Sequence, residues 1–268
     1  MSKSYRVGTF GGRELAAVRD VSLQVGPGEV VSLIGESGSG KSTIGRMILR
    51  LTPVTSGTIT FEGTDVAGFA GARLRAYYGN VQGVFQDPFS CFNPIFKADR
   101  VLELLREPYF ASLDGHRWRA KVAASLEAVR LDPGQVLGKY PHQLSGGQLQ
   151  RLLVARALLL DIRLLVADEI ISMLDASTRI DVLNLLGDLK ARGLGILFIT
   201  HDLSLGNYIS DTAVILHRGE VVEEGPTERV FGQPRHPYTR ALLASVPTLH
   251  RKWDRAERLV REPVGEGG

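Results

Sequence analysis

A glycine-rich segment near the N-terminus has the residue types that bind phosphate. It comprises Gly35, Glu36, Ser37, Gly38, Ser39, Gly40, Lys41, Ser42 and Thr43, and it fits the pattern G-x-x-x-x-G-K-[S/T]. Glycines let the backbone curl until successive N–H groups point inward at phosphate oxygens, and a following helix adds the positive end of its dipole. Lys41 would bring a charge to the β- and γ-phosphates, and Ser42 would be a ligand of Mg²⁺. The segment therefore predicts a site for a nucleoside triphosphate.

Two carboxylates follow an apolar run farther along the chain. Residues 164–167 lead into Asp168 and Glu169, so both acids would lie at the carboxyl end of a buried strand, where ligands bind in open α/β sheets. Asp168 would hold Mg²⁺ through water, and Glu169 would polarise the water that attacks a phosphate. The alternative is that the pair only caps a helix. A phosphate-binding segment in the same chain favours the chemical interpretation.

A third segment also has the composition of an anion site. Ser145, Gly146, Gly147 and Gln148 precede a predicted helix over 149–160, and a serine with two glycines at a helix start can hold an anion. Because the chain already has one phosphate-binding segment, the second suggests a contact with the nucleotide of another copy. A plain helix cap is the alternative.

The elements around these residues alternate between strands and helices. Residues 29–34 are mostly apolar and lead into the glycines, which is typical of a buried parallel strand, and 41–51 have apolar residues at helical spacing. Residues 164–167 and 196–199 predict two more buried strands. The segment between them predicts a helix with one apolar face, formed by Val182, Leu185, Leu186 and Leu189. Further on, His217-Arg218-Gly219 lies between two short apolar runs and predicts a hairpin turn.

The middle of the chain lacks strand patterns. From about 93 to 160 helical patterns dominate, with candidate helices over 101–106, 118–130 and 148–160. We therefore expect one domain over 1–268, with an α/β core over 1–92 and 161–232 and a helical subdomain over 93–160. The tail over 233–268 is polar and loosely patterned.

Composition narrows the class of protein. The chain has 268 residues, of which 44% are hydrophobic and 23% charged, and a mean hydropathy of +0.01, which excludes disorder over most of its length. A net charge of +3 and a pI near 9.1 mildly suit an anionic partner, but a solvated mixed surface is the favoured interpretation. Apolar runs reach only four residues, as in 152–155, and there is no export signal, so we expect a chain that crosses no membrane by itself but can dock on a protein that does.

The three motifs, in this order, resemble the ATP-binding subunits of ATP-binding-cassette (ABC) transporters, from about Tyr5 to Pro247. The sequence Leu-Ser-Gly-Gly-Gln between the two nucleotide motifs is highly specific. The resemblance implies a P-loop NTPase core of the α/β class with a mostly parallel sheet and an inserted helical subdomain. It also implies ATP and Mg²⁺ as cofactors, and ATP hydrolysis coupled to transport across a membrane.

The resemblance assigns further roles. Two such domains pair head to tail around two ATP molecules, so Ser145 and Gly147 would touch the γ-phosphate held by the partner chain. Asp175 matches the loop that joins the two halves of the dimer. Phe10 or Tyr5 could stack on the adenine, and either could instead be plain core.

Two more residues match catalytic positions of the family. His201 follows the strand pattern over 196–199 and matches the histidine that contacts the γ-phosphate. Gln86 matches the glutamine that meets Mg²⁺ or water and the permease. With Phe89 and Phe92, it is expected to form the surface that receives a helix of the permease.

The subfamily is indicated by two segments. Residues 86–94 and 236–243 look like those of importers for dipeptides, oligopeptides and nickel, whose relatives also import oligosaccharides. Some relatives carry a cysteine cluster in the tail, but the single cysteine here is Cys91, so no iron–sulfur site and no disulfide are expected, and a reducing cytosol is the expected compartment. Two positions depart from the family, Ile170 in place of proline and Met173 in place of alanine. Ile170 frees the backbone and is expected to loosen the turn behind Glu169.

The resemblance implies an ATP-hydrolysing subunit on the cytoplasmic face of the cell membrane, powering uptake of peptides or a related small solute. Its partners would be a second ATPase subunit, either a copy or a related chain, a transmembrane permease and, indirectly, an extracytoplasmic solute-binding protein; no nucleic acid is expected. Importers of oligosaccharides or nickel, and a soluble non-transport ABC ATPase, remain alternatives. An exporter ATPase and a P-loop nucleotide kinase fit the motifs less well.

Overall fold

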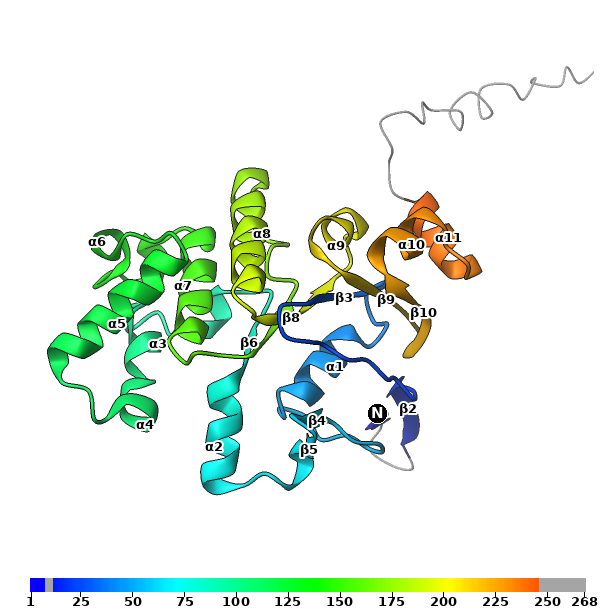
Figure 1. The fold of residues 1–268 in the computed structure, drawn as a ribbon, viewed down its shortest axis with the longest axis horizontal. Helices are drawn as coiled ribbons and strands as arrows, with labels where there is room; N and C mark the ends of the chain where they lie inside the picture. Colours follow the sequence, from blue (N-terminus) through cyan, green and yellow to red (C-terminus); the bar gives the residue numbers. More distant parts are fainter. Residues whose placement is uncertain (8–11, 246–268) are drawn as a thin grey trace, which may run out of the picture.

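A six-stranded sheet runs through the middle of the molecule (Figure 1). The structure is a computed structural model and describes residues 1–7 and 12–245. The strand order is β10-β9-β3-β8-β7-β6, and every neighbouring pair is parallel except β9 and β10. The bounds are β3 Val30–Ile34, β6 Val81–Val84, β7 Leu164–Asp168, β8 Gly195–Thr200, β9 Thr212–His217 and β10 Glu220–Pro226. The mostly parallel α/β fold predicted from the sequence is confirmed.

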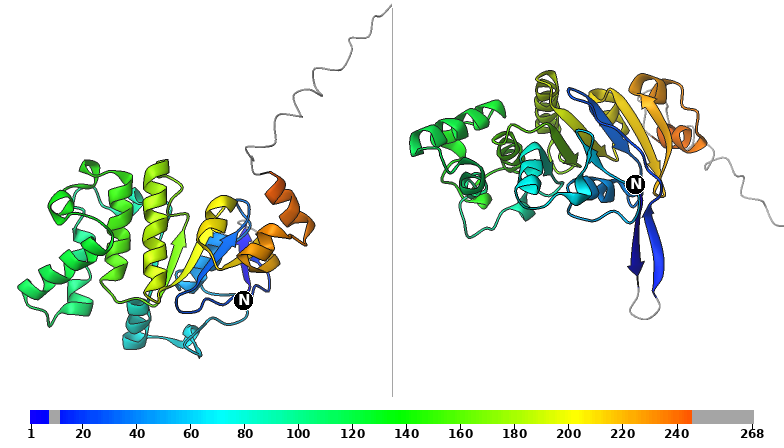
Figure 2. Two further views of the ribbon diagram at one scale, coloured as in Figure 1. Left: turned by 45° about the horizontal axis from the view of Figure 1, so that its top comes forward. Right: turned by 60° about the horizontal axis from the view of Figure 1, so that its bottom comes forward.

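Helices cover both faces of this sheet (Figures 1 and 2). Successive side chains of a strand point to opposite faces, so Leu197 and Ile199 join the core beneath α1 (Lys41–Ile48), whereas Ile196 and Phe198 join the core beneath α8 (Ala176–Ala191). A shorter helix, α9 (Leu203–Ile209), lies beside α8 on the same face. Apolar residues on both strand faces explain why these strands appear in the sequence as unbroken apolar runs.

The segment between β6 and β7 is helical. It contains α3 (Arg100–Glu103), α4 (Arg106–Phe110), α5 (Gly115–Ala128), α6 (Pro133–Val136) and α7 (Gly146–Leu158), and no strand lies between 93 and 160. The three helices predicted there correspond to α3 with α4, to α5 and to α7, with ends shifted by several residues. Leu149 and Leu152 of α7 and Trp118 of α5 pack into the larger core, which joins this segment to the β6 side of the sheet.

Small elements without a clear sequence pattern complete the N-terminal half. The strands β1 (Lys3–Val7) and β2 (Arg13–Val18) form a hairpin that projects from the body (Figure 2), and β4 (Thr60–Phe61) pairs with β5 (Thr64–Asp65). The helix α2 (Gly71–Asn80) leads into β6. Sequence patterns predicted none of these, because two-residue strands and exposed hairpins bury too little to show a period.

The segment after Gly232, whose sequence is polar and loosely patterned, contains a helix, α11 (Pro237–Ala244), which follows α10 (Thr227–Gly232). The carboxylate of Glu223 accepts hydrogen bonds from the backbone N–H groups of Arg235 (2.8 Å) and His236 (3.0 Å), which fixes the start of α11. These C-terminal helices lie at the opposite edge of the sheet from α3–α7 (Figure 1). Within the described residues, no helix has the length and apolar character needed to cross a membrane.

Candidate functional site

The glycine-rich segment forms the loop that joins β3 to α1. Gly40, at its end, has φ +107°, a conformation that favours glycine, and a Cβ atom there would lie 2.5 Å from the carbonyl oxygen of Ala17. Helix α1 begins directly after it with no side chain capping its first N–H groups. The first turn of α1 is therefore open to an anion.

Lys41 is buried inside this loop. Its side chain is 5% exposed, and its ammonium group donates hydrogen bonds to the carbonyl oxygens of Gly35 (2.7 Å) and Glu36 (2.8 Å). Burial lowers the pKa of Lys41, and the nearby carboxylates, Glu169 above all, oppose that shift. The loop thus holds a cation at the point where phosphate oxygens would arrive.

A hydroxyl and a carboxylate meet beside Lys41. Ser42 Oγ donates a hydrogen bond to Asp168 Oδ1 at 3.2 Å. Burial raises the pKa of Asp168, and the bond from Ser42 counteracts the shift. Because oxygen ligands of this kind suit Mg²⁺, the donor set fits the metal that the sequence predicted.

Glu169 and His201 form a pair at the ends of β7 and β8. Glu169 Oε1 lies 3.0 Å from His201 Nδ1. The backbone of Glu169 has φ +52°, which is strained for this residue, and it is held by a bond to Ile199 O (2.9 Å) and by one from Ser172 Oγ (2.9 Å). Ile170 is 1% exposed within the core, so the turn that was expected to be loose is anchored by packing and hydrogen bonds.

These groups line one cavity of about 440 Å³. Its walls are formed by Ala17, Ser37, Gly38, Gly40, Lys41, Ser42, Thr43, Gln86, Glu169 and His201. The fold therefore brings together the phosphate-binding loop, the glutamate, the histidine and the glutamine. Only Ala17 has no counterpart in the sequence prediction, because a small residue in an edge hairpin carries no signal.

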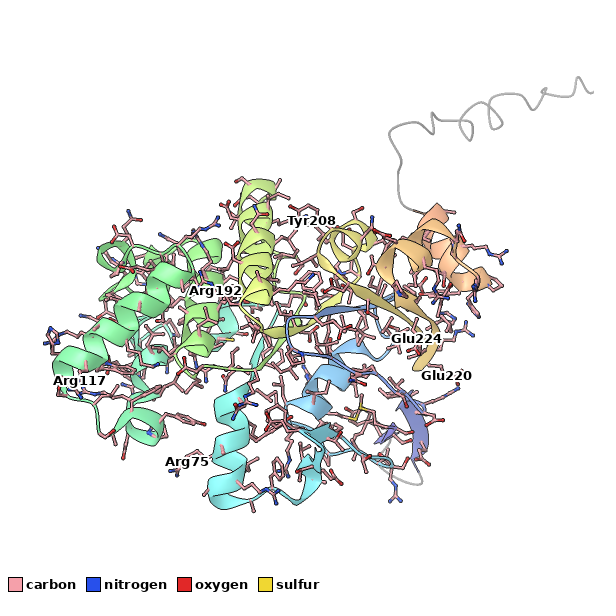
Figure 3. The ribbon with its side chains drawn as sticks, viewed as in Figure 1. Arg75, Arg117, Arg192, Tyr208, Glu220 and Glu224 are labelled. Atoms are coloured by element: carbon pink, nitrogen blue, oxygen red, sulfur yellow. The ribbon has the colours of Figure 1, made fainter. Side chains whose placement is uncertain are left out.

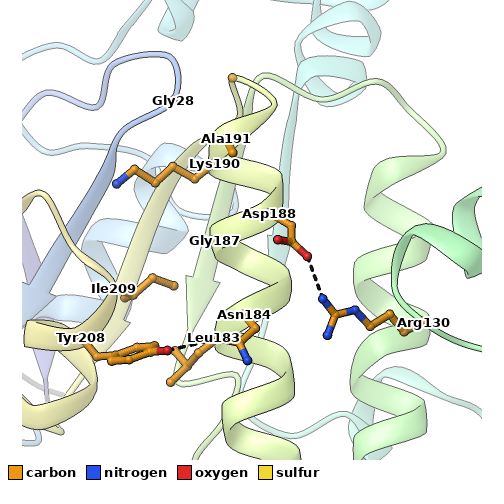
Figure 4. Close-up of a pocket in the computed structure, with 11 residues that line it drawn as sticks. Gly28, Arg130, Leu183, Asn184, Gly187, Asp188, Lys190, Ala191, Tyr208 and Ile209 are labelled. Atoms are coloured by element: carbon orange, nitrogen blue, oxygen red, sulfur yellow. Dashed lines mark hydrogen bonds and ion pairs between the residues drawn. The ribbon is translucent and has the colours of Figure 1, made fainter.

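A larger hollow of about 930 Å³ lies elsewhere, between α8 and α9 (Figure 4). Its polar groups already pair with each other: Arg130 with Asp188 at 2.9 Å, and the hydroxyl of Tyr208 with Asn184 at 3.2 Å. None of the motif residues line it. The volume of a cavity alone therefore does not indicate the candidate site. The reactive groups that converge on the smaller cavity do indicate it.

Ser145 and its neighbours do not line the cavity. Ser145 Oγ accepts a bond from Gln148 N (3.2 Å), and Gln148 Oε1 accepts one from Ser145 N (2.9 Å), which caps α7 at both residues. Gly147 packs against α8, since a Cβ there would lie 2.5 Å from Thr178 Cγ2. Within one chain this segment is a satisfied helix start.

Asp175 also lies outside the cavity and caps α8. Its carboxylate accepts bonds from Ser177 Oγ (2.6 Å), Thr178 N (3.0 Å) and Thr178 Oγ1 (2.8 Å), and these bonds, that of Ser177 first, hold its pKa well below the usual value. Of the two aromatic candidates for the adenine, Phe10 lies outside the described residues, and Tyr5 is 38% exposed.

The surface expected to receive a permease helix needs one correction. Phe89 is 51% exposed, but Phe92 is 7% exposed and packs in the larger core. Phe89 is therefore available for a partner, whereas Phe92 stabilises the junction between η2 (Phe89–Cys91) and the helices that follow.

Comparisons with known proteins identify the family to which the chain belongs. The sequence profile described as "ABC transporter" matches residues 18–172, and that of the "Oligopeptide/dipeptide transporter, C-terminal region" matches 222–265. The glutathione import ATP-binding protein GsiA of Escherichia coli (strain K12) is 42% identical over 250 residues, which are 92% of this chain but 40% of that protein. A putative peptide import ATP-binding protein of Brucella ovis is 43% identical over 236 residues, 87% of this chain and 74% of that protein.

Among solved structures, the ATP-binding cassette MJ0796, dimeric and bound to ADP and Pi, superposes with a TM-score of 0.74 at 28% identity, covering 84% of this chain and 96% of that one. The chain spans about 40% of the length of the glutathione import proteins. A nucleotide-binding loop, two acids at a strand end and a capped Ser-Gly-Gly-Gln helix start thus occur together on the fold of these cassettes, and the chain belongs to the ABC transporter family.

Proposed function

We propose that this chain binds and hydrolyses ATP as the energy-supplying subunit of an importer for peptides or a related small solute. The observation that carries the proposal is the single cavity in which Lys41, Ser42, Glu169 and His201 converge. The match of residues 222–265 to the peptide-transporter C-terminal region favours peptides over the oligosaccharide and nickel alternatives. We treat 93–160 as a helical subdomain of one domain, and 1–92 with 161–232 as its core.

The chain's own groups would act as follows. The ammonium group of Lys41 would exchange the carbonyls of Gly35 and Glu36 for phosphate oxygens, and the open first turn of α1 would add backbone N–H groups. Ser42, Asp168 and Gln86 would hold Mg²⁺, which when bound neutralises charge on the phosphates. Glu169 would accept a proton from the attacking water, and His201 would hold that carboxylate in place while reaching the γ-phosphate.

The second half of each site would come from a partner subunit. Ser145, Gly146, Gly147 and Gln148 lie outside the cavity of their own chain, which supports a head-to-tail dimer in which they meet the partner's ATP. Asp175 would lie at the contact between the halves. We propose that this pair, of two copies or of two related chains, sits on a permease at the cytoplasmic face of the membrane.

The test is ATP hydrolysis by the purified chain in the presence of Mg²⁺. We expect specific activity to rise with protein concentration, because each site needs Ser145 from a second subunit, and to rise again when the permease is present. Full activity that does not change on dilution would contradict the shared site. No hydrolysis at any concentration, with or without the permease, would contradict the proposed function.

A further inference from the structure

The segment over 236–243 is one of the two that indicate the subfamily, and in the structure it packs against β10. It forms α11, beside β10 at the edge of the sheet (Figure 1). Glu223 of β10 binds the N–H groups that precede this helix, His236 caps it, and Thr239 is fully buried. The helix is therefore fixed in place rather than attached loosely to the surface.

This docking brings Tyr238 to the phosphate-binding loop. Its ring lies against that of His217 at the end of β9, with 3.9 Å between ring centroids and 36° between the ring planes, and its hydroxyl accepts a hydrogen bond from the backbone N–H of Glu36 at 3.4 Å. Burial raises the pKa of Tyr238 above its usual value. The bond is long for its type.

Two other parts of the chain therefore hold the phosphate-binding loop, one near each of its ends. Near Ser39, Gly219 of the β9–β10 turn donates its N–H to the carbonyl oxygen of Ser39 at 2.9 Å. At the other end, the hydroxyl of Tyr238 accepts a bond from the N–H of Glu36, which shares its peptide group with the carbonyl of Gly35. Lys41 donates a hydrogen bond to that Gly35 carbonyl oxygen at 2.7 Å. The position of this peptide group thus affects an acceptor to which Lys41 is hydrogen-bonded before phosphate binds.

We propose that Tyr238 is a positioning residue for nucleotide binding: its hydroxyl sets the conformation of the loop at Glu36, so that the C-terminal helix influences affinity for the phosphates of ATP. The inference rests on the proposed function, since it concerns the same site. It gives the segment over 236–243 a role in the ATP cycle.

The experiment uses the full chain and the substitution Tyr238→Phe, which keeps the ring on His217 and removes only the hydroxyl. The matched control is Tyr208→Phe, which removes a tyrosine hydroxyl bonded to Asn184 at 3.2 Å on α9, outside the cavity (Figures 3 and 4). A fluorescent ATP analogue, displaced by unlabelled ATP, gives the dissociation constant. We expect Tyr238→Phe to raise it about two- to fivefold, within the range of one hydrogen bond, and Tyr208→Phe to leave it unchanged.

Two further readouts separate positioning from general stability. In hydrolysis at a fixed protein concentration, KM for ATP should rise while kcat stays the same. Without nucleotide, the N–H of Glu36 should exchange with solvent faster in Tyr238→Phe, whereas those of β3 and α11 should not. Faster exchange throughout α11 and β9 would overturn the inference, because the hydroxyl would then only stabilise the fold.

The outcomes also separate the two proposals. If the wild-type chain binds ATP and Tyr238→Phe binds it equally well, the role of Tyr238 is overturned and the proposed function stands. If the wild-type chain binds no ATP, the proposed function fails and this inference fails with it.

Discussion

Helices α1 and α7 both begin at segments that contain glycine, yet the two starts differ. At α1 the residue before the helix is Gly40, with φ +107° and no side-chain cap, so the first N–H groups are left for a ligand. At α7 it is Ser145, whose side chain and that of Gln148 cap the helix. A ligand can enter the first start directly, but at the second it must compete with bonds already made. The difference is consistent with the proposal that the loop before α1 binds the phosphates of its own chain's ATP, whereas Ser145 acts on the ATP of a partner.

The largest effect, on ATP hydrolysis, should come from removing the carboxylate of Glu169, which lies near the uncapped start of α1. Glu169→Gln keeps the shape of the side chain but loses the group that accepts a proton, so ATP hydrolysis should fall about 10²- to 10⁴-fold. Affinity for ATP should be kept or increased, because a negative charge near the γ-phosphate is lost. Steady-state hydrolysis and ATP-binding titrations measure both. The control is Glu220→Gln, an exposed residue of the β9–β10 hairpin (Figure 3); hydrolysis by Glu169→Gln at the control's rate would remove Glu169 from the mechanism.

The next largest effect, on ATP binding, should come from removing the charge of Lys41 at the start of α1. Lys41→Ala removes a charged donor buried in the loop, so the dissociation constant for Mg-ATP should rise about 10- to 100-fold, the range for a hydrogen bond to a charged group. Equilibrium binding measures this. Lys139→Ala, at an exposed position of the helical segment, should bind as the wild type does. Equal affinity in both variants would mean that the loop around α1 is not the phosphate site.

A substitution at Ser145, the capped start of α7, should have a smaller effect on ATP binding, and its main effect should be on the assembly of two chains. Ser145→Arg should leave ATP binding by a dilute chain nearly unchanged, because Ser145 does not line its own cavity. In the Glu169→Gln background it should prevent the ATP-dependent dimer, since the longer side chain would block closure. Size-exclusion chromatography with and without ATP distinguishes the two states. A dimer that forms despite Ser145→Arg would show that the contrast between the helix starts has no role in assembly.

The smallest effect is on stability at Asp175. The folded-state pKa of Asp175 is depressed, so its contribution is present above the unfolded value of about 3.9 and is lost as the pH falls through the folded pKa. Asp175→Asn keeps a capping residue but does not titrate. We expect its thermal midpoint to lie about 1–3 °C below that of the wild type at pH 7. The difference should begin to narrow as the pH falls below about 3.9 and should close only as the pH passes through the folded pKa, which lies well below that value. A difference that stays constant down to pH 2 would contradict the assignment.

The sequence predicted best what is long, apolar or rich in glycine. The buried strands β3, β7 and β8 and the loop at Gly35–Thr43 carry strong local patterns, so their existence could be derived from the sequence, whereas the order of the strands in the sheet could not. The sequence patterns predicted no helix over 237–244, because the start of α11 is fixed by Glu223, which lies in another element. Local patterns contain no information on such a distant contact.

The lack of information on distant contacts also limits how much of the candidate site can be predicted from the sequence. Asp168 and Glu169 were identified by their place after a strand, but the 3.0 Å pairing of Glu169 with His201 depends on the register of β7 against β8. Ala17 and Tyr238 reach the loop only through tertiary packing. Phe92 was assigned to the surface because residue type cannot distinguish a buried aromatic from an exposed one.

The strand order also has a consequence during biosynthesis. Among the strands that the structure describes, β3, which leads into the loop over 35–43, pairs with β8 and β9 and with neither β1 nor β2. At typical rates of synthesis the chain between Ile34 and Gly195 takes roughly ten seconds or more to emerge from the ribosome. During that time the five residues of β3, all of which are buried in the folded protein, have no neighbouring strand with which to pair. The nascent chain therefore carries this apolar segment, next to the loop over 35–43, unpaired until β8 is made, and the pairing of β3 on both sides is complete only after β9.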